Sequence, residues 1–163
     1  MEYSLFMIKP IAYEHKQEIL DIIKKKLQIV STTDVCLSEE FLNKLYASET
    51  NEEFRKINSK CLANKKACIG VVRGENAKTK LVEICGDKPI GEECDKESIR
   101  YIYRTNKRIN ISGRDFYLNA IHKSSPKDAD YEVALYIKYV LGKDLKSPIE
   151  KKQKNIYYED EGR

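Results

Sequence analysis

The segment at residues 3–10, with the sequence YSLFMIKP, decides the fold class that this chain can adopt. Its apolar run covers residues 3–8 and ends at Lys9 and Pro10. A short apolar run bounded in this way is typical of a fully buried strand. The sequence therefore predicts that residues 3–8 form the central strand of a sheet.

Downstream of this strand, the sequence alternates between helical and extended patterns. From Glu14 onward, apolar residues such as Ile19, Ile23 and Leu27 recur at helical spacing, with lysines and acids on the other face. Residues 29–35 are rich in β-branched side chains, which predicts a second strand. The other expected elements are helices at residues 38–47, 51–62, 76–85, 98–103 and 127–141 and strands at residues 67–72 and 116–121.

Three residues mark expected helix boundaries. Ser38 stands before two acids and is the predicted N-cap of its helix. Gly86 is expected to end the helix at residues 76–85, because glycine accepts the backbone conformation that closes a helix. Pro126 lies near the start of the last helix, where proline is tolerated.

The resulting order is β-α-β-α-α-β-α-β-α. Its most economical packing is an α+β, ferredoxin-like sandwich, in which helices pack on a four-stranded antiparallel sheet. We expect one domain at residues 1–141, followed by a charged tail at residues 142–163. This fold does not by itself identify a function.

The composition is that of an ordinary soluble domain. The chain has 163 residues, of which 41% are hydrophobic and 34% charged. It contains no apolar run of about 20 residues, so no membrane helix is expected. Its first residues lack the charge pattern of a secretory signal, which predicts a cytoplasmic location. The net charge of +4 suits a small anionic ligand as well as a polyanion.

The cysteines predict free thiols in a reducing compartment. There are five, an odd number, and no two are spaced as CxxC. This pattern argues against a disulfide framework and against a structural zinc site.

The chain has two histidines, and they differ in context. His15 opens a lysine-rich helix and is expected to be a surface residue. His122 ends the predicted fourth strand, within the sequence NAIHKS at residues 119–124, where a side chain can face a cleft. Glu132 lies near enough in the next helix to fold back on His122, and a carboxylate on one ring nitrogen leaves the other neutral and nucleophilic. Lys9 and Arg100 could bring positive charge to the same edge.

Taken together, these segments resemble the nucleoside diphosphate kinase family over residues 3–138. The similar segments are FMIKP at residues 6–10, SIR at 98–100, the NxxHxS pattern at 119–124 and ADYEVALYI at 129–137. Each is weak alone, but the combination is specific. The resemblance implies a kinase that moves the γ-phosphoryl group of a nucleoside triphosphate to a nucleoside diphosphate.

The family's functional roles are carried onto matching positions of this chain. The resemblance implies that His122 becomes a phosphohistidine, that Glu132 holds its ring and that Ser124 supports the catalytic geometry. Nucleotide contacts are implied for the following residues: Lys9, Tyr46, Arg100 and Asn119 near the phosphates, the sugar or the histidine, Phe54 stacked on the base, and Phe116 as the opposite wall.

The resemblance also implies the cofactor, the kinetics and the assembly. Mg²⁺ would be held mainly by the phosphates of ATP or another nucleotide, because magnesium keeps its waters and needs few protein ligands. Donor and acceptor would use one site in turn, which gives ping-pong kinetics. A homo-oligomer is the family's usual state.

The chain departs from the family at several positions. Val82 and Glu52 stand where the family has phosphate-binding arginines, and Asp87 and Lys88 precede Pro89 where a threonine is expected. The loop at residues 89–97 is unusual, and a polar insert occupies residues 103–115. The cations that could replace the missing arginines are Lys80, Lys88, Arg55 and the basic residues of the insert.

Two accounts of these departures are open. The chain is either a working but divergent kinase or a catalytically weak nucleotide-binding module that retains the fold. The retained His122, Glu132, Lys9, Arg100 and Asn119 favour activity. Nucleic-acid binding through the insert and the basic tail segment at residues 151–154 is a third hypothesis. We disfavour it, because charged runs of this kind are usually solvated surface.

Overall fold

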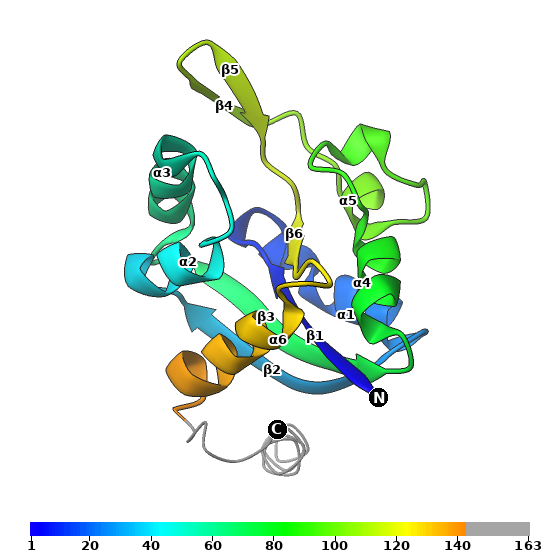
Figure 1. Ribbon diagram of the computed structural model, residues 1–163. Coiled ribbons are helices and arrows are strands. Elements are labelled where there is room, and N and C mark those ends of the chain that lie inside the picture. Colours follow the sequence, from blue (N-terminus) through cyan, green and yellow to red (C-terminus); the bar gives the residue numbers. More distant parts are fainter. Residues whose placement is uncertain (143–163) are drawn as a thin grey trace.

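A computed structural model describes residues 1–142, and its centre is a four-stranded sheet. The strands are β1 (Glu2–Ile8), β2 (Gln28–Cys36), β3 (Lys66–Gly74) and β6 (Ile121–Lys123), in the order β2-β3-β1-β6. All neighbouring strands are antiparallel. The expected α+β sandwich is therefore confirmed, with the 3–8 segment as an inner strand (Figure 1).

Helices cover both faces of this sheet (Figure 1). On one face, Leu5 and Met7 belong to a core cluster that includes buried residues of α2 and α6. On the other face, Phe6 and Ile8 pack in a cluster with α1 and α4. This alternation follows from the two-residue period of a strand. The α-helices are α1 (Lys16–Lys24), α2 (Glu39–Leu45), α3 (Glu52–Leu62), α4 (Ala77–Cys85), α5 (Ile99–Ile102) and α6 (Ala129–Leu135).

The helix ends agree with the capping residues in the sequence. The Ser38 hydroxyl accepts a hydrogen bond from the Phe41 amide at 3.1 Å, as expected of an N-cap. The Asn51 side chain caps α3 in the same way. Gly86 closes α4 with a φ of +109°, in a region that favours glycine. The two predicted boundaries, at Ser38 and Gly86, are confirmed.

The predicted strand at residues 116–121 is wrong. The segment splits into β5 (Arg114–Tyr117), which pairs with β4 (Arg108–Ile111), and a link that leads into β6. Ser112 and Gly113 form the turn with φ values of +53° and +82°. Two residues with positive φ match the right-handed twist of a hairpin, so the polar insert folds locally instead of extending the main sheet. This β4–β5 hairpin projects beyond α3 and α5 (Figure 1).

Smaller differences occur at the ends of other elements. The segment Pro10–His15 is a 3-10 helix that precedes α1, and Gly91–Glu93 forms another 3-10 turn in the expected loop. The last helix begins at Ala129 and continues as a π-helical turn, Tyr136–Val140. The predicted tail at residues 142–163, with its basic segment, lies outside the described residues apart from residue 142.

Candidate active site

His122 lies at the centre of β6, not at the strand end that the sequence suggested. Its backbone pairs with Met7 of β1, so its side chain is on the same face as Met7, toward α2 and α6. The ring of Tyr46, the residue that ends α2, is 4.9 Å from the imidazole between ring centroids. The imidazole is therefore enclosed by a sheet, a helix end and an aromatic ring.

A buried carboxylate fixes the orientation of the imidazole. Glu132, in the first turn of α6, places Oε1 2.7 Å from Nε2 of His122, and the Ser124 hydroxyl donates to the same oxygen at 2.8 Å. The side chain of Glu132 is only 3% exposed and that of His122 13%. Because a carboxylate accepts hydrogen bonds, the proton of a neutral imidazole belongs on Nε2. Nδ1 then carries the free lone pair.

Lys9 follows β1 directly and enters a chain of hydrogen bonds. Its ammonium donates to Oδ1 of Asn119 at 2.9 Å, and the Asn119 amide donates to the Pro89 carbonyl at 3.1 Å. Burial, together with the nearby charges of Arg100 and Lys123, lowers the pKa of Lys9 to about 7. An anion that binds beside Lys9 would reverse this effect.

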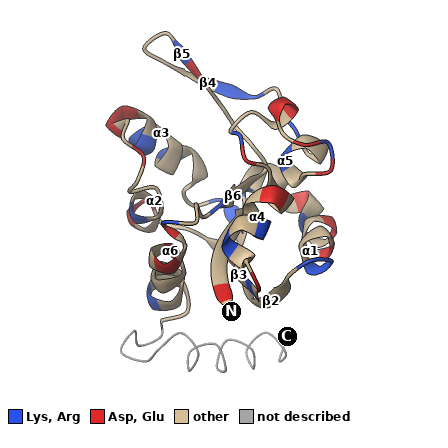
Figure 2. Cartoon of the chain, turned by 45° about the vertical axis from the view of Figure 1, so that its right-hand side comes forward, with Lys and Arg blue, Asp and Glu red and all other residues tan. Residues whose placement is uncertain are grey.

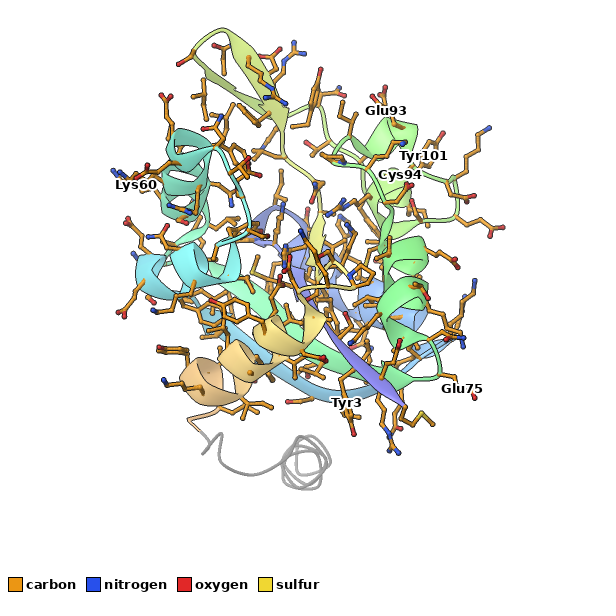
Figure 3. All side chains as sticks on the ribbon, in the orientation of Figure 1. Tyr3, Lys60, Glu75, Glu93, Cys94 and Tyr101 are labelled. Carbon is orange, nitrogen blue, oxygen red and sulfur yellow. The ribbon has the colours of Figure 1, made fainter. Side chains whose placement is uncertain are left out.

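Arg100, at the start of α5, holds the backbone around the histidine. Its Nε and Nη2 donate to the Ile121 carbonyl at 3.1 and 3.0 Å, and its Nη1 donates to the Lys88 carbonyl at 2.9 Å. The Cys94 thiol donates to the same Lys88 carbonyl at 3.3 Å, and Figure 3 labels Cys94 beside α5. Nη1 and Nη2 each keep one further N–H group. Arg100 thus holds the backbone of β6 in place, and one N–H group on each of Nη1 and Nη2 stays available to a further acceptor.

The two aromatic residues expected on either side of a base lie against each other. The rings of Phe54 in α3 and Phe116 in β5 are stacked, with centroids 4.4 Å apart and planes 27° from parallel. The guanidinium of Arg114 lies over Phe116 at 5.0 Å, and Ser112 contacts Glu53 at 3.3 Å. The hairpin therefore leans on α3, and no space for a base remains between the two rings in this structure.

The positions that depart from the family pattern do not supply obvious phosphate ligands. Val82 is half-buried on α4, and Glu52 pairs with Lys56 at 3.2 Å on the outside of α3. Lys80 and Arg55 are half-buried, and Lys88 is exposed. Within the insert, Arg104 and Arg108 bond to neighbouring tyrosines, and Arg108 also faces Asp115 at 3.8 Å. These arginines are occupied locally.

Lys123 is the residue of this region that sequence reasoning missed. It follows His122 on β6, where the NxxHxS pattern leaves the position free, and it is half-buried. Burial lowers its pKa, as does the charge of Arg100. The only signal in the sequence was a cation next to the candidate nucleophile.

Two cavities formed by the described residues are not lined by His122. One, of about 950 Å³, is lined by residues of α1, α4 and the following loop, including Val82 and Asp87. The other, of about 460 Å³, lies between the 3-10 turn Gly91–Glu93 and the β4–β5 hairpin. The candidate site is therefore defined by its connected side chains and not by either cavity.

The described residues contain neither a cluster of metal-binding side chains nor a helix that could cross a membrane. Residues 1–142 contain no group of three or more His, Cys, Asp or Glu side chains that could hold a metal ion. No helix among them is long and apolar enough to cross a membrane. The five cysteines all lie in this range, and they form no disulfide bond with one another.

The family follows from comparison with known proteins. Residues 2–140 match the family model described as nucleoside diphosphate kinase. The chain belongs to the nucleoside diphosphate kinase family. Among solved structures, the kinase of Aquifex aeolicus is similar, with a TM-score of 0.71 and 25% identity, over 85% of this chain and 96% of that one.

Two other comparisons extend this result. A Borrelia burgdorferi nucleoside diphosphate kinase, solved with bound vanadate and ADP as a transition-state mimic, has a TM-score of 0.70 and 18% identity, over 85% of this chain and 88% of that one. At this identity it supports the fold alone. A curated relative, a thioredoxin domain-containing protein 3 homolog of Ciona intestinalis, is 27% identical over 135 residues, which are 81% of this chain. The match spans only 19% of that relative's length.

Proposed function

We propose that this chain is an active nucleoside diphosphate kinase that transfers a phosphoryl group through Nδ1 of His122. The observation that carries the proposal is the contact between Nε2 of His122 and the buried carboxylate of Glu132, with Ser124 on the same oxygen. This arrangement keeps one nitrogen occupied and the other nucleophilic. Membership of the family supports the reaction class.

The proposed reaction has two matched halves. The Nδ1 lone pair attacks the γ-phosphorus of a nucleoside triphosphate, and the bond between that phosphorus and its bridging oxygen breaks. The electron pair leaves with the diphosphate, and the positive charge that develops on the phosphorylated ring faces the carboxylate of Glu132. A second diphosphate then attacks the phosphohistidine and restores the lone pair. Positioning and charge stabilisation do most of this work.

The neighbouring side chains have distinct proposed roles. Lys9, held by Asn119, and the remaining donors of Arg100 bind phosphate oxygens. Tyr46 packs on the imidazole, and burial raises the pKa of its phenol, which keeps it uncharged. Phe54 stacks on the base, which happens once the ring of Phe116 has moved away from it.

The donor set fits a metal that arrives with the nucleotide. Lys9, Arg100 and Lys123 are cations, and the carboxylate at the imidazole, Glu132, already accepts hydrogen bonds from His122 and Ser124. Mg²⁺ held by the phosphates would neutralise charge that develops on them. The cytoplasmic location, the homo-oligomeric state and the role of residues 142–163 stay predictions.

The test is a phosphoryl-exchange assay with ATP, Mg²⁺ and a second nucleoside diphosphate. We expect turnover with parallel double-reciprocal plots, as in a ping-pong mechanism, and loss of turnover in His122→Asn. ADP binding without turnover in the wild-type chain would instead support the weak nucleotide-binding module, which the stacked Phe54 and Phe116 favour. Equal turnover in His122→Asn would also reject the proposal.

A further inference from the structure

Lys123 is a half-buried cation whose ammonium has no carboxylate within ion-pair distance among the described residues. No hydrogen bond or ion pair of its ammonium is found among the described residues. The other two cations near it have defined partners: Lys9 donates to Asn119, and Arg100 donates to the carbonyls of Ile121 and Lys88. All of these partners are neutral. The region therefore has three basic side chains, none of which forms an ion pair with a carboxylate of the described residues, and this favours a bound anion.

The strand register places Lys123 on the opposite face of β6 from His122. Lys123 pairs with Phe6 of β1, whose side chain belongs to the core cluster that contains α1 and α4. Its charge interacts with Cys85 at the end of α4, with Asp87 in the loop that follows and with Arg100 on α5. Lys123 thus reaches toward the C-terminal end of α4.

That end of α4 is where the family pattern places an arginine and this chain has Val82. Cys85, which interacts with Lys123, is three residues after Val82, so the two lie on neighbouring positions of one helix face. Val82 and Asp87 also line the same cavity. The ammonium of Lys123 therefore lies near the region from which the missing arginine would act.

Three of the other basic side chains are less suited to this role. Lys88 is exposed, and Arg108 and Arg114 of the hairpin contact Asp115 and Phe116. Lys123 is closer to the other cations of the site, because its charge acts on both Lys9 and Arg100.

We propose that Lys123 binds the phosphates of the nucleotide and replaces the arginine that is absent at Val82. The inference rests on the proposed function, because it assigns a further ligand to the same nucleotide. The residue binds the substrate, and the attack on phosphorus remains with His122.

The experiment measures the binding of ADP and of inorganic pyrophosphate to the full chain by calorimetry, together with the phosphorylation rate of His122 by ATP. The variants are Lys123→Gln, Lys123→Arg and, as a control, Lys127→Gln, which changes an exposed lysine nearby. We expect Lys123→Gln to weaken both ligands about 10- to 100-fold, as for loss of one charged phosphate contact. Lys123→Arg should stay within about threefold of wild type, and Lys127→Gln should match wild type.

The outcomes separate this inference from the proposed function. Wild-type-like affinity for both ligands in Lys123→Gln overturns the role of Lys123 and leaves the kinase intact. A wild-type chain that binds pyrophosphate through Lys123 but never phosphorylates His122 rejects the kinase alone. A wild-type chain that binds neither ligand rejects both. Thermal unfolding of each variant separates loss of binding from loss of fold, and the arginine variant keeps the test valid if glutamine is not tolerated.

Discussion

The two sides of the site, the histidine side and the phosphate side, differ in how completely they match the family. On the histidine side, His122, Glu132 and Ser124 form one connected network between β6 and α6. On the proposed phosphate side, Val82 and Glu52 occupy positions at which the family resemblance implies arginines. A nucleophile needs its partner within hydrogen-bonding distance and at a fixed angle. Charge around a phosphate can come from several directions, so that side tolerates redistribution.

The largest effect is expected from the histidine side. Glu132→Gln should reduce the phosphorylation rate by about 10²- to 10⁴-fold, because an amide nitrogen can donate to Nε2 and move the ring proton to Nδ1. Single-turnover kinetics with labelled ATP measures this rate. Asp130→Asn is the matched control, because Asp130 is an exposed acid on the same helix. Equal rates for the two variants would show that the carboxylate of Glu132 does not orient the nucleophile.

An intermediate effect is expected at Lys9. Its buried ammonium has a pKa of about 7, so above that pH the free chain holds Lys9 mostly neutral. Phosphates favour the charged form, so ADP binding must then take up a proton, and the affinity should fall up to tenfold per pH unit above pH 7. Lys9→Met should bind ADP about 10- to 100-fold more weakly at pH 6. Its ADP affinity should no longer fall as the pH rises above 7.

Calorimetry in buffers of different ionisation enthalpy measures the proton uptake directly. Lys60→Met is the control, since Lys60 is exposed and labelled on α3 in Figure 3. Binding of ADP to wild type without proton uptake at pH 8 would contradict the role of Lys9.

A smaller and asymmetric effect is expected at the aromatic pair. Phe54→Ala should weaken ADP binding about 5- to 100-fold, the range for loss of one base-stacking ring. Phe116→Ala should strengthen it by up to about threefold, because the ring of Phe116 covers the surface that the base needs. Fluorescence titration with a labelled nucleotide compares the two. A loss in Phe116→Ala as large as in Phe54→Ala would favour a base held between both rings.

The smallest effect in the wild-type background is expected from restoring the arginine. Val82→Arg should raise ADP affinity by less than about threefold, because Lys123 already supplies a cation there. In the Lys123→Gln background the same change should recover most of the lost affinity. Isothermal titration calorimetry with ADP on the wild type, the two single variants and the double variant measures this double-mutant cycle. A tenfold gain in wild type would mean that the phosphate side lacks a cation.

The sequence predicted the first three strands of the main sheet, because their signals are local, and misplaced the fourth. The apolar run at residues 3–8, the N-cap at Ser38 and the stop at Gly86 each depend on a few neighbouring residues. The hairpin was missed although its signals are local too. The segment 108–111 alternates polar and apolar residues and Gly113 is a turn residue, but the polar composition of the insert masked the hairpin.

The site was only partly accessible from the sequence. The contact between Glu132 and His122 could be expected from their short separation and from the family resemblance, and the structure places the two atoms 2.7 Å apart. The stacking of Phe54 on Phe116 could not, because it depends on how the hairpin lies against α3. The position of Lys123 depends on strand register, which the misplaced strand at residues 116–121 concealed.

Charge on the surface gives little support to nucleic-acid binding by the described residues. Figure 2 shows basic and acidic segments side by side on α1, α3 and α4. A polyanion needs a contiguous basic face. We still predict that the chain does not bind nucleic acid, and a titration with DNA at low salt tests this prediction.

The most direct test of the central claim is magnetic resonance of the phosphorylated chain with isotope-labelled histidine. After brief reaction with ATP and Mg²⁺, the account predicts one phosphorus atom, coupled to Nδ1 of His122. Phosphorus on Nε2, on another residue, or on no residue at all would contradict it.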